Sequence, residues 1–367
     1  MNAIEADAFG QIESLRSGKD GLPIIIDEAQ RSKSLALAIK KIVDADRRKG
    51  QFVLTGSSNL FTNAEVADSL AGRIRTLKLW PLTISETERK PPANLLDWAL
   101  TDEPRLDEIG NPDALGRSGY IELFLAGGFP ETRQLALRPR QRAYRGYVDS
   151  VVDRDVADII RIRKTDQLRR LVEQMAVRTA LEIKVTELSK LLGLTRVTVD
   201  QYLDVLERLS LIIRLGAWSS GEGRREIKNA KWHFVDTGVA AALRRFNLSS
   251  FNLTDNPTAL GGLVESFIFN ELIRSLPNLE NDVRLYHWRD NDQREIDILA
   301  DAGSRLIGIE VKASTSVNTA DFKHLDWFTN KGPGRKRTIT KLVFYLGEQK
   351  LSFGDRRFAL PVSVLWS

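Results

Sequence analysis

The chain of 367 residues contains no cysteine and only three histidines, which are widely spaced. This composition excludes a disulfide framework, a cysteine-ligated zinc or iron–sulfur site and a cysteine nucleophile. No stretch approaches the roughly 18 uncharged apolar residues that a membrane span needs. The first residues have neither the basic segment nor the apolar core of a secretory signal. We therefore expect a cytoplasmic protein with no membrane contact.

Positive charge is unevenly distributed. The formal net charge is +5, but residues 161–235 hold 15 Lys and Arg against 9 Asp and Glu, which leaves the rest near -1. A local positive field attracts polyanions such as nucleic acid. A solvated basic surface is the alternative interpretation.

The apolar pattern predicts an α/β multidomain protein. Short apolar runs at 22–26, 51–54 and 74–79 are typical of parallel strands buried on both faces, and a helical pattern at 34–46 separates the first two. This β–α–β order predicts a sheet layer in a first domain, residues 1–85. The further predicted parts are a helical region at 86–160, a winged helix-turn-helix at 161–246, a linker at 247–262 and a second α/β domain at 261–367.

An acidic pair follows the first apolar run. Ile24-Ile25-Ile26 leads into Asp27 and Glu28, which is the form of a Walker B strand. Such a strand carries the pair to the carboxyl edge of a parallel sheet, where Asp27 could hold Mg²⁺ and Glu28 could polarise a water for attack on a γ-phosphate. Thr55 and Ser57, after the next run, would add polar groups to the same edge. Asp27 as a helix cap is the alternative.

With these residues, several ordered motifs closely resemble a prokaryotic family of AAA-type ATPases in which a C-terminal domain of unknown function follows the ATPase module. The motifs of the first block are Ile25-Ile26-Asp27-Glu28-Ala29-Gln30-Arg31, Leu54-Thr55-Gly56-Ser57-Ser58-Asn59-Leu60, Ser69-Leu70-Ala71-Gly72-Arg73 and Leu79-Trp80-Pro81-Leu82. The later ones are Gly127-Gly128-Phe129-Pro130-Glu131, Asp153-Arg154-Asp155-Val156, Phe234-Val235-Asp236-Thr237-Gly238 and Ile309-Glu310-Val311-Lys312. The resemblance covers essentially the whole chain. It implies ATP binding, with Arg73 at the γ-phosphate or between subunits; an ordinary surface arginine is the alternative.

The chain departs from that family at one motif. Members carry a GxxxxGK[ST] phosphate-binding loop before the acidic strand, whereas this sequence has no Gly-Lys-Ser/Thr, and Gly18-Lys19-Asp20 lacks the hydroxyl residue. Because that loop makes most contacts to the β- and γ-phosphates, we expect ATP binding to be defective here. Three explanations stay open: the remaining strands close up, a second copy or another partner supplies the missing half, or the reading frame is a truncated or miscalled version of a longer gene, which we favour.

The spacing of apolar residues in 185–203 predicts two helices around a turn at Gly193, followed by a strand and a basic wing. In a winged helix, Arg196, Thr198 and Gln201 of the second helix could contact DNA, and the wing could add two further contacts, from Arg224 and Arg225. A winged helix that serves only for packing or protein contact is the alternative.

The C-terminal part carries a carboxylate and lysine pattern. Asp297, Glu310 and Lys312 have the spacing D-x(12)-E-x-K on two predicted strands, and Glu265 opens the preceding helix. The order helix, strands, Asp, Glu-x-Lys, helix, strand resembles the PD-(D/E)xK nuclease fold. That resemblance implies Mg²⁺ on the three carboxylates and Lys312 acting on the attacking water. A buried ion pair of Asp297 and Glu310 with Lys312, in a nuclease-derived scaffold, is the alternative.

These patterns together predict an AAA-type ATPase-family protein that acts on or near nucleic acid, with Mg²⁺ and ATP as candidate cofactors. A Mg²⁺-dependent nuclease and a non-catalytic DNA- or protein-binding remnant are the competing hypotheses.

Overall fold

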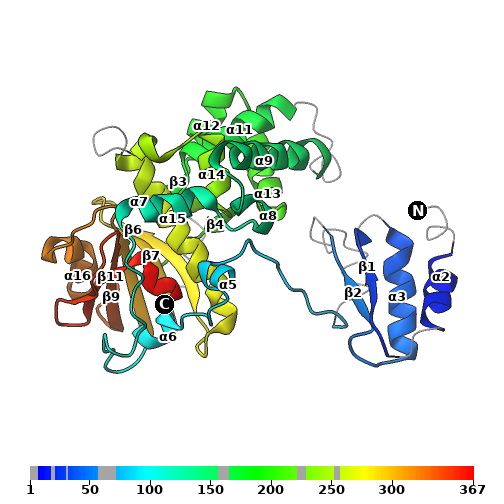
Figure 1. Cartoon of the computed structure of the whole chain (residues 1–367), viewed down its shortest axis with the longest axis horizontal. Helices are drawn as coiled ribbons and strands as arrows, with labels where there is room; N and C mark the ends of the chain where they lie inside the picture. Colours follow the sequence, from blue (N-terminus) through cyan, green and yellow to red (C-terminus); the bar gives the residue numbers. More distant parts are fainter. Residues whose placement is uncertain are drawn as a thin grey trace. The chain divides into compact units, whose positions relative to one another are not determined.

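The computed structural model (Figure 1) describes residues 7–17, 21–29, 32–56, 72–155, 165–220, 229–251 and 257–367. The chain divides into two compact units, Met1–Leu79 with Arg154–Arg161 and Trp80–Asp153 with Ile162–Ser367. We describe each unit by itself. No helix among the described residues is long and apolar enough to cross a membrane.

The first unit is a β–α–β layer, as predicted. Its elements are α2 (Ala8–Arg16), β1 (Ile24–Ile26), α3 (Lys33–Ala45) and β2 (Phe52–Leu54). The two strands pair in parallel, with Ile24 opposite Phe52. Helix α3 buries an apolar stripe, including Leu35, Ile39 and Ile42, against Ile12 of α2 and one face of the strands.

The other face of this two-stranded sheet is not buried. Ile25 is 70% exposed and Val53 is 45% exposed, because no described element covers that face. The prediction of strands buried on both faces is therefore wrong for the described residues. The predicted third strand at 74–79 is also absent: this segment has no strand partner to bond its backbone, and Leu79 is 94% exposed.

The second unit contains a six-stranded mixed sheet, in the order β10-β11-β9-β8-β7-β6. Its strands are β6 (Arg284–Arg289), β7 (Glu295–Asp301), β8 (Arg305–Val311), β9 (Thr338–Tyr345), β10 (Leu351–Ser352) and β11 (Arg357–Pro361). Helix α15 (Pro257–Ser275) precedes the sheet, and α16 (Lys323–Asn330) connects β8 to β9, which run parallel. The predicted order of helix, three strands, helix and strand is thus observed.

The two helices pack on the sheet through large apolar side chains. Leu325 and Phe328 of α16 share one core cluster with Ile296 and Leu306 of the strands. Phe267 of α15 packs edge-on against Trp366 in the last turn of the chain, η8 (Val362–Trp366). In Figure 1, η8 and α15 lie on the side of the sheet away from α16.

Helices dominate the earlier part of the second unit, as expected. They are α5 (Ile84–Glu88), α6 (Leu95–Ala99), α7 (Arg117–Ala126), α8 (Pro130–Arg133), α9 (Leu137–Ser150), the π-helical turn η3 (Val151–Asp155), α11 (Thr165–Val177), α12 (Val185–Leu192), α13 (Arg196–Arg208) and α14 (Thr237–Leu243). A three-stranded antiparallel sheet accompanies them, in the order β3 (Leu181–Glu182), β5 (Lys231–Phe234), β4 (Ile212–Leu215).

The predicted linker at 247–262 is shorter than expected. Residues 248–251 form the turn η5 (Leu248–Phe251), and residues 252–256 lie outside the described part of the chain. Gly261 and Gly262 belong to α15 rather than to a loop. A side chain at position 262 would collide with the Thr179 carbonyl, so this glycine allows close packing rather than a chain turn.

The middle region and the C-terminal sheet form one body. Ala217 bridges to His287 of β6, and the Trp218 amide donates to the His287 carbonyl at 2.7 Å. The regions predicted at 161–246 and 261–367 both lie in the second unit.

Three of the sequence motifs meet at the buried carboxylate of Asp236. This side chain caps α14 by accepting from the Val239 amide at 3.1 Å, and it also accepts from the Gly128 amide at 2.6 Å. The Gly128 carbonyl in turn accepts from the Leu82 amide at 2.8 Å. Burial raises the pKa of Asp236, and these amide donors oppose the rise. The junction joins segments more than 100 residues apart.

Gly127 offers a test of this junction. Its backbone (φ 68°, ψ -170°) lies in a region that only glycine readily adopts, and an added Cβ would meet the Asp236 carboxylate and the Tyr144 hydroxyl. We expect Gly127→Ala to lower the free energy of unfolding by about 2–4 kcal/mol, measured by chemical denaturation.

The matched control is Gly146→Ala, in open space on α9. There alanine should change stability by less than about 1 kcal/mol, in the stabilising direction. Equal effects of the two substitutions would contradict the junction.

Candidate functional site

Two of the predicted nucleotide-site residues lie together in the first unit. The Thr55 hydroxyl donates to the Asp27 carboxylate where β2 and β1 end. The Thr55 amide bonds the Ile26 carbonyl at 2.9 Å, so the strand ends stay paired up to this point. Glu28 follows with φ 53°, a left-handed conformation that is uncommon for a side-chain-bearing residue. Ser57 lies outside the described residues.

Arg73 lies elsewhere in that unit. Its Nε donates to Asp44 at 2.6 Å, and this hydrogen bond lowers the pKa of that carboxyl. Asp44 belongs to the last turn of α3, whereas Asp27 precedes the first turn, and a 13-residue helix is about 20 Å long. The structure does not bring Arg73 to the carboxylate pair, which favours the surface-arginine alternative.

The predicted pair of helices around a glycine is present. Gly193 ends α12 in a left-handed conformation (φ 64°), and Thr195 caps α13 by accepting from the Thr198 amide. Thr198 also shares a hydroxyl hydrogen bond with Thr195, so it serves the cap. Arg224 and Arg225, the predicted wing residues, lie outside the described part of the chain.

The exposed surface of α13 carries mixed charge. Arg196 and Gln201 are exposed, as DNA contact would require. Arg196, however, pairs with Asp200 one turn later at 3.8 Å, and Asp204 is exposed on the following turn. These carboxylates reduce the attraction of the helix for phosphate.

The predicted nuclease-like residues come together in the second unit. Glu265 lies on α15, Asp297 on β7, Glu310 near the end of β8, and Lys312 just after β8. Lys312 Nζ donates to Glu310 Oε1 at 2.8 Å. Asp297 Oδ2 accepts from the Val311 amide at 2.9 Å, which holds the end of β8 against β7.

A fifth residue, Lys231 of β5, completes this group. Its Nζ donates to Glu265 Oε1 at 2.8 Å and to Asp297 Oδ1 at 3.1 Å, and its side chain is 5% exposed. Burial alone would lower the pKa of Lys231, but the two carboxylates raise it, so the lysine stays charged. We call Lys231, Glu265, Asp297, Glu310 and Lys312 the carboxylate–lysine cluster.

Protonation completes the charge balance of the carboxylate–lysine cluster. Burial, together with the charge of Asp297, raises the pKa of Glu310 to about 8. Burial also raises the pKa of Glu265. Three carboxylates and two ammonium groups sum to one negative charge, and one proton bound to a carboxyl would neutralise it.

The cluster does not suit Mg²⁺. Among the described residues there is no group of three or more His, Cys, Asp or Glu side chains arranged to hold a metal ion. Lys231 occupies one oxygen of Glu265 and one of Asp297, and only Glu310 Oε2 is buried with no hydrogen-bond partner. Mg²⁺ in proteins is usually held by one or two carboxylates and several waters, and here the Lys231 ammonium group competes with it for two of the three carboxylates. The geometry favours the ion-pair alternative, with Lys231 as the partner of Asp297.

Sequence reasoning missed Lys231, although a signal was present. It is the one charged residue in the run Ala230-Lys231-Trp232-His233-Phe234-Val235, all of which is buried. A charge inside a buried strand has to be paired, since leaving it alone is very costly. The run therefore indicates a buried carboxylate partner.

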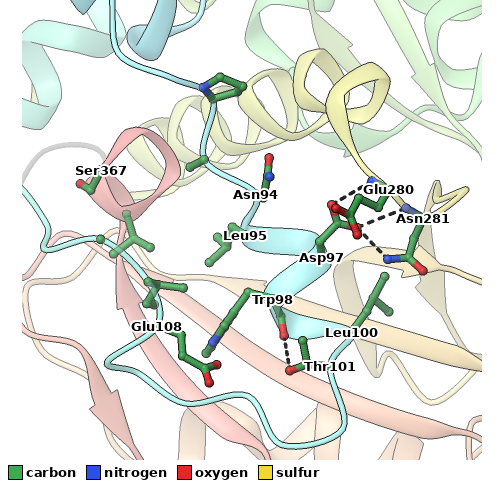
Figure 2. Close-up of a pocket in the computed structure, with 15 residues that line it drawn as sticks. Asn94, Leu95, Asp97, Trp98, Leu100, Thr101, Glu108, Glu280, Asn281 and Ser367 are labelled. Atoms are coloured by element: carbon green, nitrogen blue, oxygen red, sulfur yellow. Dashed lines mark hydrogen bonds between the residues drawn. The ribbon is translucent and has the colours of Figure 1, made fainter.

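A separate pocket of about 620 Å³ lies beside α6 (Figure 2). Asp97 at its rim accepts from the backbone amides of Glu280 and Asn281 and from the Asn281 side chain, at 2.8–3.3 Å. Trp98 of α6 donates through its ring nitrogen to the Arg105 carbonyl at 2.9 Å. None of the predicted site residues lines this pocket.

Comparison with known proteins divides the chain into three matched regions. A model of an AAA domain matches residues 3–88, a domain of unknown function (DUF8612) matches 117–250, and another (DUF4143) matches 260–365. The N-terminal region is thus similar to AAA-type ATPases, and two domains of unknown function follow it.

Three relatives are described only as uncharacterized proteins. Those of Mycobacterium tuberculosis and Mycobacterium bovis are each 26% identical to this chain over 318 residues, covering 86% of this chain and 64% of theirs. One of Haemophilus influenzae is 24% identical over 331 residues, covering 88% of this chain and 74% of its own length. The chain thus spans about two thirds of the length of the mycobacterial relatives.

Lys231→Met tests the carboxylate–lysine cluster. Removing the cation leaves buried carboxylates without their partner, so we expect the free energy of unfolding to fall by about 3–5 kcal/mol in a denaturation experiment. Lys184→Met is the matched control, because Lys184 pairs with Glu187 at an exposed site; it should cost less than about 1 kcal/mol.

Millimolar MgCl₂ should leave the melting temperature of the wild-type protein unchanged. A rise that Glu310→Ala abolishes would show that the carboxylates bind metal, and would contradict the ion-pair interpretation.

Glu310 should make the free energy of unfolding depend on pH. Its pKa is about 8 in the folded protein against its usual 4.5, so between these values the folded state holds a proton that the unfolded chain loses. The free energy of unfolding should therefore fall as pH rises from about 4.5 to about 8. Glu310→Gln should flatten this slope in denaturation curves taken across that range. An unchanged slope would show that Glu310 is ionised in the folded protein.

Proposed function

We propose that the chain is a component of an AAA-type ATPase that acts on nucleic acid, with Asp27 and Glu28 as its acidic pair. The observation that carries this proposal is the hydrogen bond between Thr55 and Asp27 at the carboxyl ends of two parallel strands. Ligands bind at this edge in open α/β sheets. Both residues lie in the region that matches an AAA domain.

The chemistry assigned to each residue is simple. Asp27, fixed by the Thr55 hydroxyl, would hold Mg²⁺ through its water shell. Glu28 would polarise the water that attacks the γ-phosphate. The sequence has no GxxxxGK[ST] loop to anchor the phosphates, so we propose that this loop comes from outside the 367 residues, in a longer form of the protein or a partner.

The second unit would serve as a non-cleaving module of such an ATPase. Its strand and helix order around α15, β6, β7, β8, α16 and β9 supports a relationship to PD-(D/E)xK nucleases, and α11, α12, α13 with β3, β5 and β4 support a winged helix. Lys231 supports loss of cleavage, because its ammonium group bonds two of the carboxylates that a catalytic metal would need. We therefore place the Mg²⁺-dependent nuclease hypothesis second.

The test compares ATP hydrolysis by this chain alone with hydrolysis by the protein extended to the nearest upstream in-frame start codon that includes a GxxxxGK[ST] motif. We expect hydrolysis only in the extended protein. Glu28→Gln should abolish it while Mg·ATP binding persists, because the glutamate acts on the water and not on the phosphates.

Glu13→Gln is the control, since Glu13 lies on α2 of the same unit and makes a partly exposed pair with Arg16. It should leave hydrolysis unchanged. Micromolar Mg·ATP binding by the chain alone, or hydrolysis that survives Glu28→Gln, would contradict the proposal. If no upstream motif is in frame, the longer form is excluded and the loop has to come from a partner.

A further inference from the structure

A local concentration of positive charge lies outside the helix pair α12 and α13. Residues 133–145 contain five arginines and no acidic residue. Their charge equals the formal net charge of the whole chain. All but the first of these arginines belong to α9.

Helical spacing gathers part of this charge on one side of α9. Arg138, Arg142 and Arg145 are four and three residues apart, so they form one stripe along the helix, and the first two are exposed. The stripe runs about 10 Å along the helix axis. The buried residues Tyr144 and Val148 occupy a different side, which packs into the unit.

A second element extends the stripe. Gln141 donates to the Phe246 carbonyl at 2.6 Å, and Arg145 donates to the Ala242 carbonyl at 3.2 Å, so α9 lies along the C-terminal end of α14 (Figure 1). Arg244 and Arg245 follow at this end of α14, and Arg244 stacks over the Phe246 ring at 4.1 Å. We call Arg138, Arg142, Arg145, Arg244 and Arg245 the arginine surface.

No carboxylate in the described part of the chain forms an ion pair with the arginine surface. Of the ion pairs between described residues, none involves these five side chains, although other arginines in the same region are paired. Asp149, one turn beyond Arg145, is itself engaged by Arg169 at 3.5 Å. The nearby Glu131 of α8 is exposed and precedes the arginine run. By contrast, Arg196 of α13 has a carboxylate partner.

We propose that the arginine surface binds the phosphate backbone of nucleic acid. Guanidinium groups bind phosphate through paired hydrogen bonds and lose little hydration in doing so. The cations lie along α9 and just after the end of α14, with Arg138, Arg142 and Arg245 exposed, and this spread suits a line of phosphates better than a single small anion. The proposal names a contact surface for the partner class proposed above, and it does not depend on ATP hydrolysis.

The experiment measures the affinity of the purified chain for a fluorescein-labelled DNA duplex by anisotropy, over a KCl series, without nucleotide or Mg²⁺. The variant is the double substitution Arg138→Glu with Arg142→Glu. Both side chains are exposed, and neither makes a side-chain hydrogen bond to another described residue. We expect affinity to fall at least tenfold at low salt. The slope of log K against log salt should decrease by about 2, one per lost phosphate contact.

A charge-matched control separates this surface from the field of the whole molecule. Arg335→Glu with Lys336→Glu makes the same change of charge at exposed positions in the loop between α16 and β9, and should leave affinity nearly unchanged. Equal loss in both double variants would show a diffuse electrostatic effect and overturn the proposal. Thermal melts of each variant confirm that it is folded.

Two further results would also overturn it. If Arg196→Ala reduces the salt slope and the α9 variant does not, DNA binds at α13 instead. If the wild-type chain fails to bind the duplex but binds phosphatidylserine vesicles through the same arginines, the anionic partner is a membrane surface. Neither outcome bears on ATP hydrolysis, which is measured in a separate assay, but the membrane outcome would also contradict nucleic acid as the partner.

Discussion

The second unit depends on one buried cation. Lys231 lies inside a strand where every neighbour is buried, and its desolvation is tolerable only because Glu265 and Asp297 receive its hydrogen bonds. These contacts connect β5 of the small sheet to α15 and β7 of the large one. The same ammonium group satisfies the carboxylates that would otherwise call for a metal ion. The two sheets are therefore joined by this buried ion pair as well as by the backbone bridge between Ala217 and His287.

The two units show contrasting relations between fold and chemistry. In the first, Asp27 and Thr55 are exposed and lie at a sheet edge where a ligand could reach them. In the second unit, the charged groups of the carboxylate–lysine cluster are largely buried and pair with one another, so they are not open to a ligand. The exposed positive charge of the second unit includes the arginine surface, where the guanidinium groups have no carboxylate partners among the described residues.

Much of this could be predicted from local patterns. Helical spacing predicted α3 and the helix pair around Gly193, and the D-x(12)-E-x-K spacing brought Asp297, Glu310 and Lys312 together correctly. The buried run around Lys231 indicates that this lysine has a carboxylate partner, but it could not show which one, because Lys231 is 34 residues before Glu265 and no periodicity links β5 to α15. The strand predicted at 74–79 was wrong because an apolar run becomes a strand only when a neighbour bonds its backbone. Gly261 and Gly262 were assigned to a linker because glycine marks both turns and tight helix contacts, and only packing separates the two.

The contact of Lys231 with α15 and β7 limits how the two matched regions of the chain can be separated in evolution. Lys231 belongs to the matched region at 117–250, and Glu265 and Asp297 belong to the one at 260–365. A gene fusion or exchange that broke the chain between these regions would leave an uncompensated charge in the interior of both products. The two regions match separate family models, yet each holds part of one buried ion pair, so their interiors depend on each other.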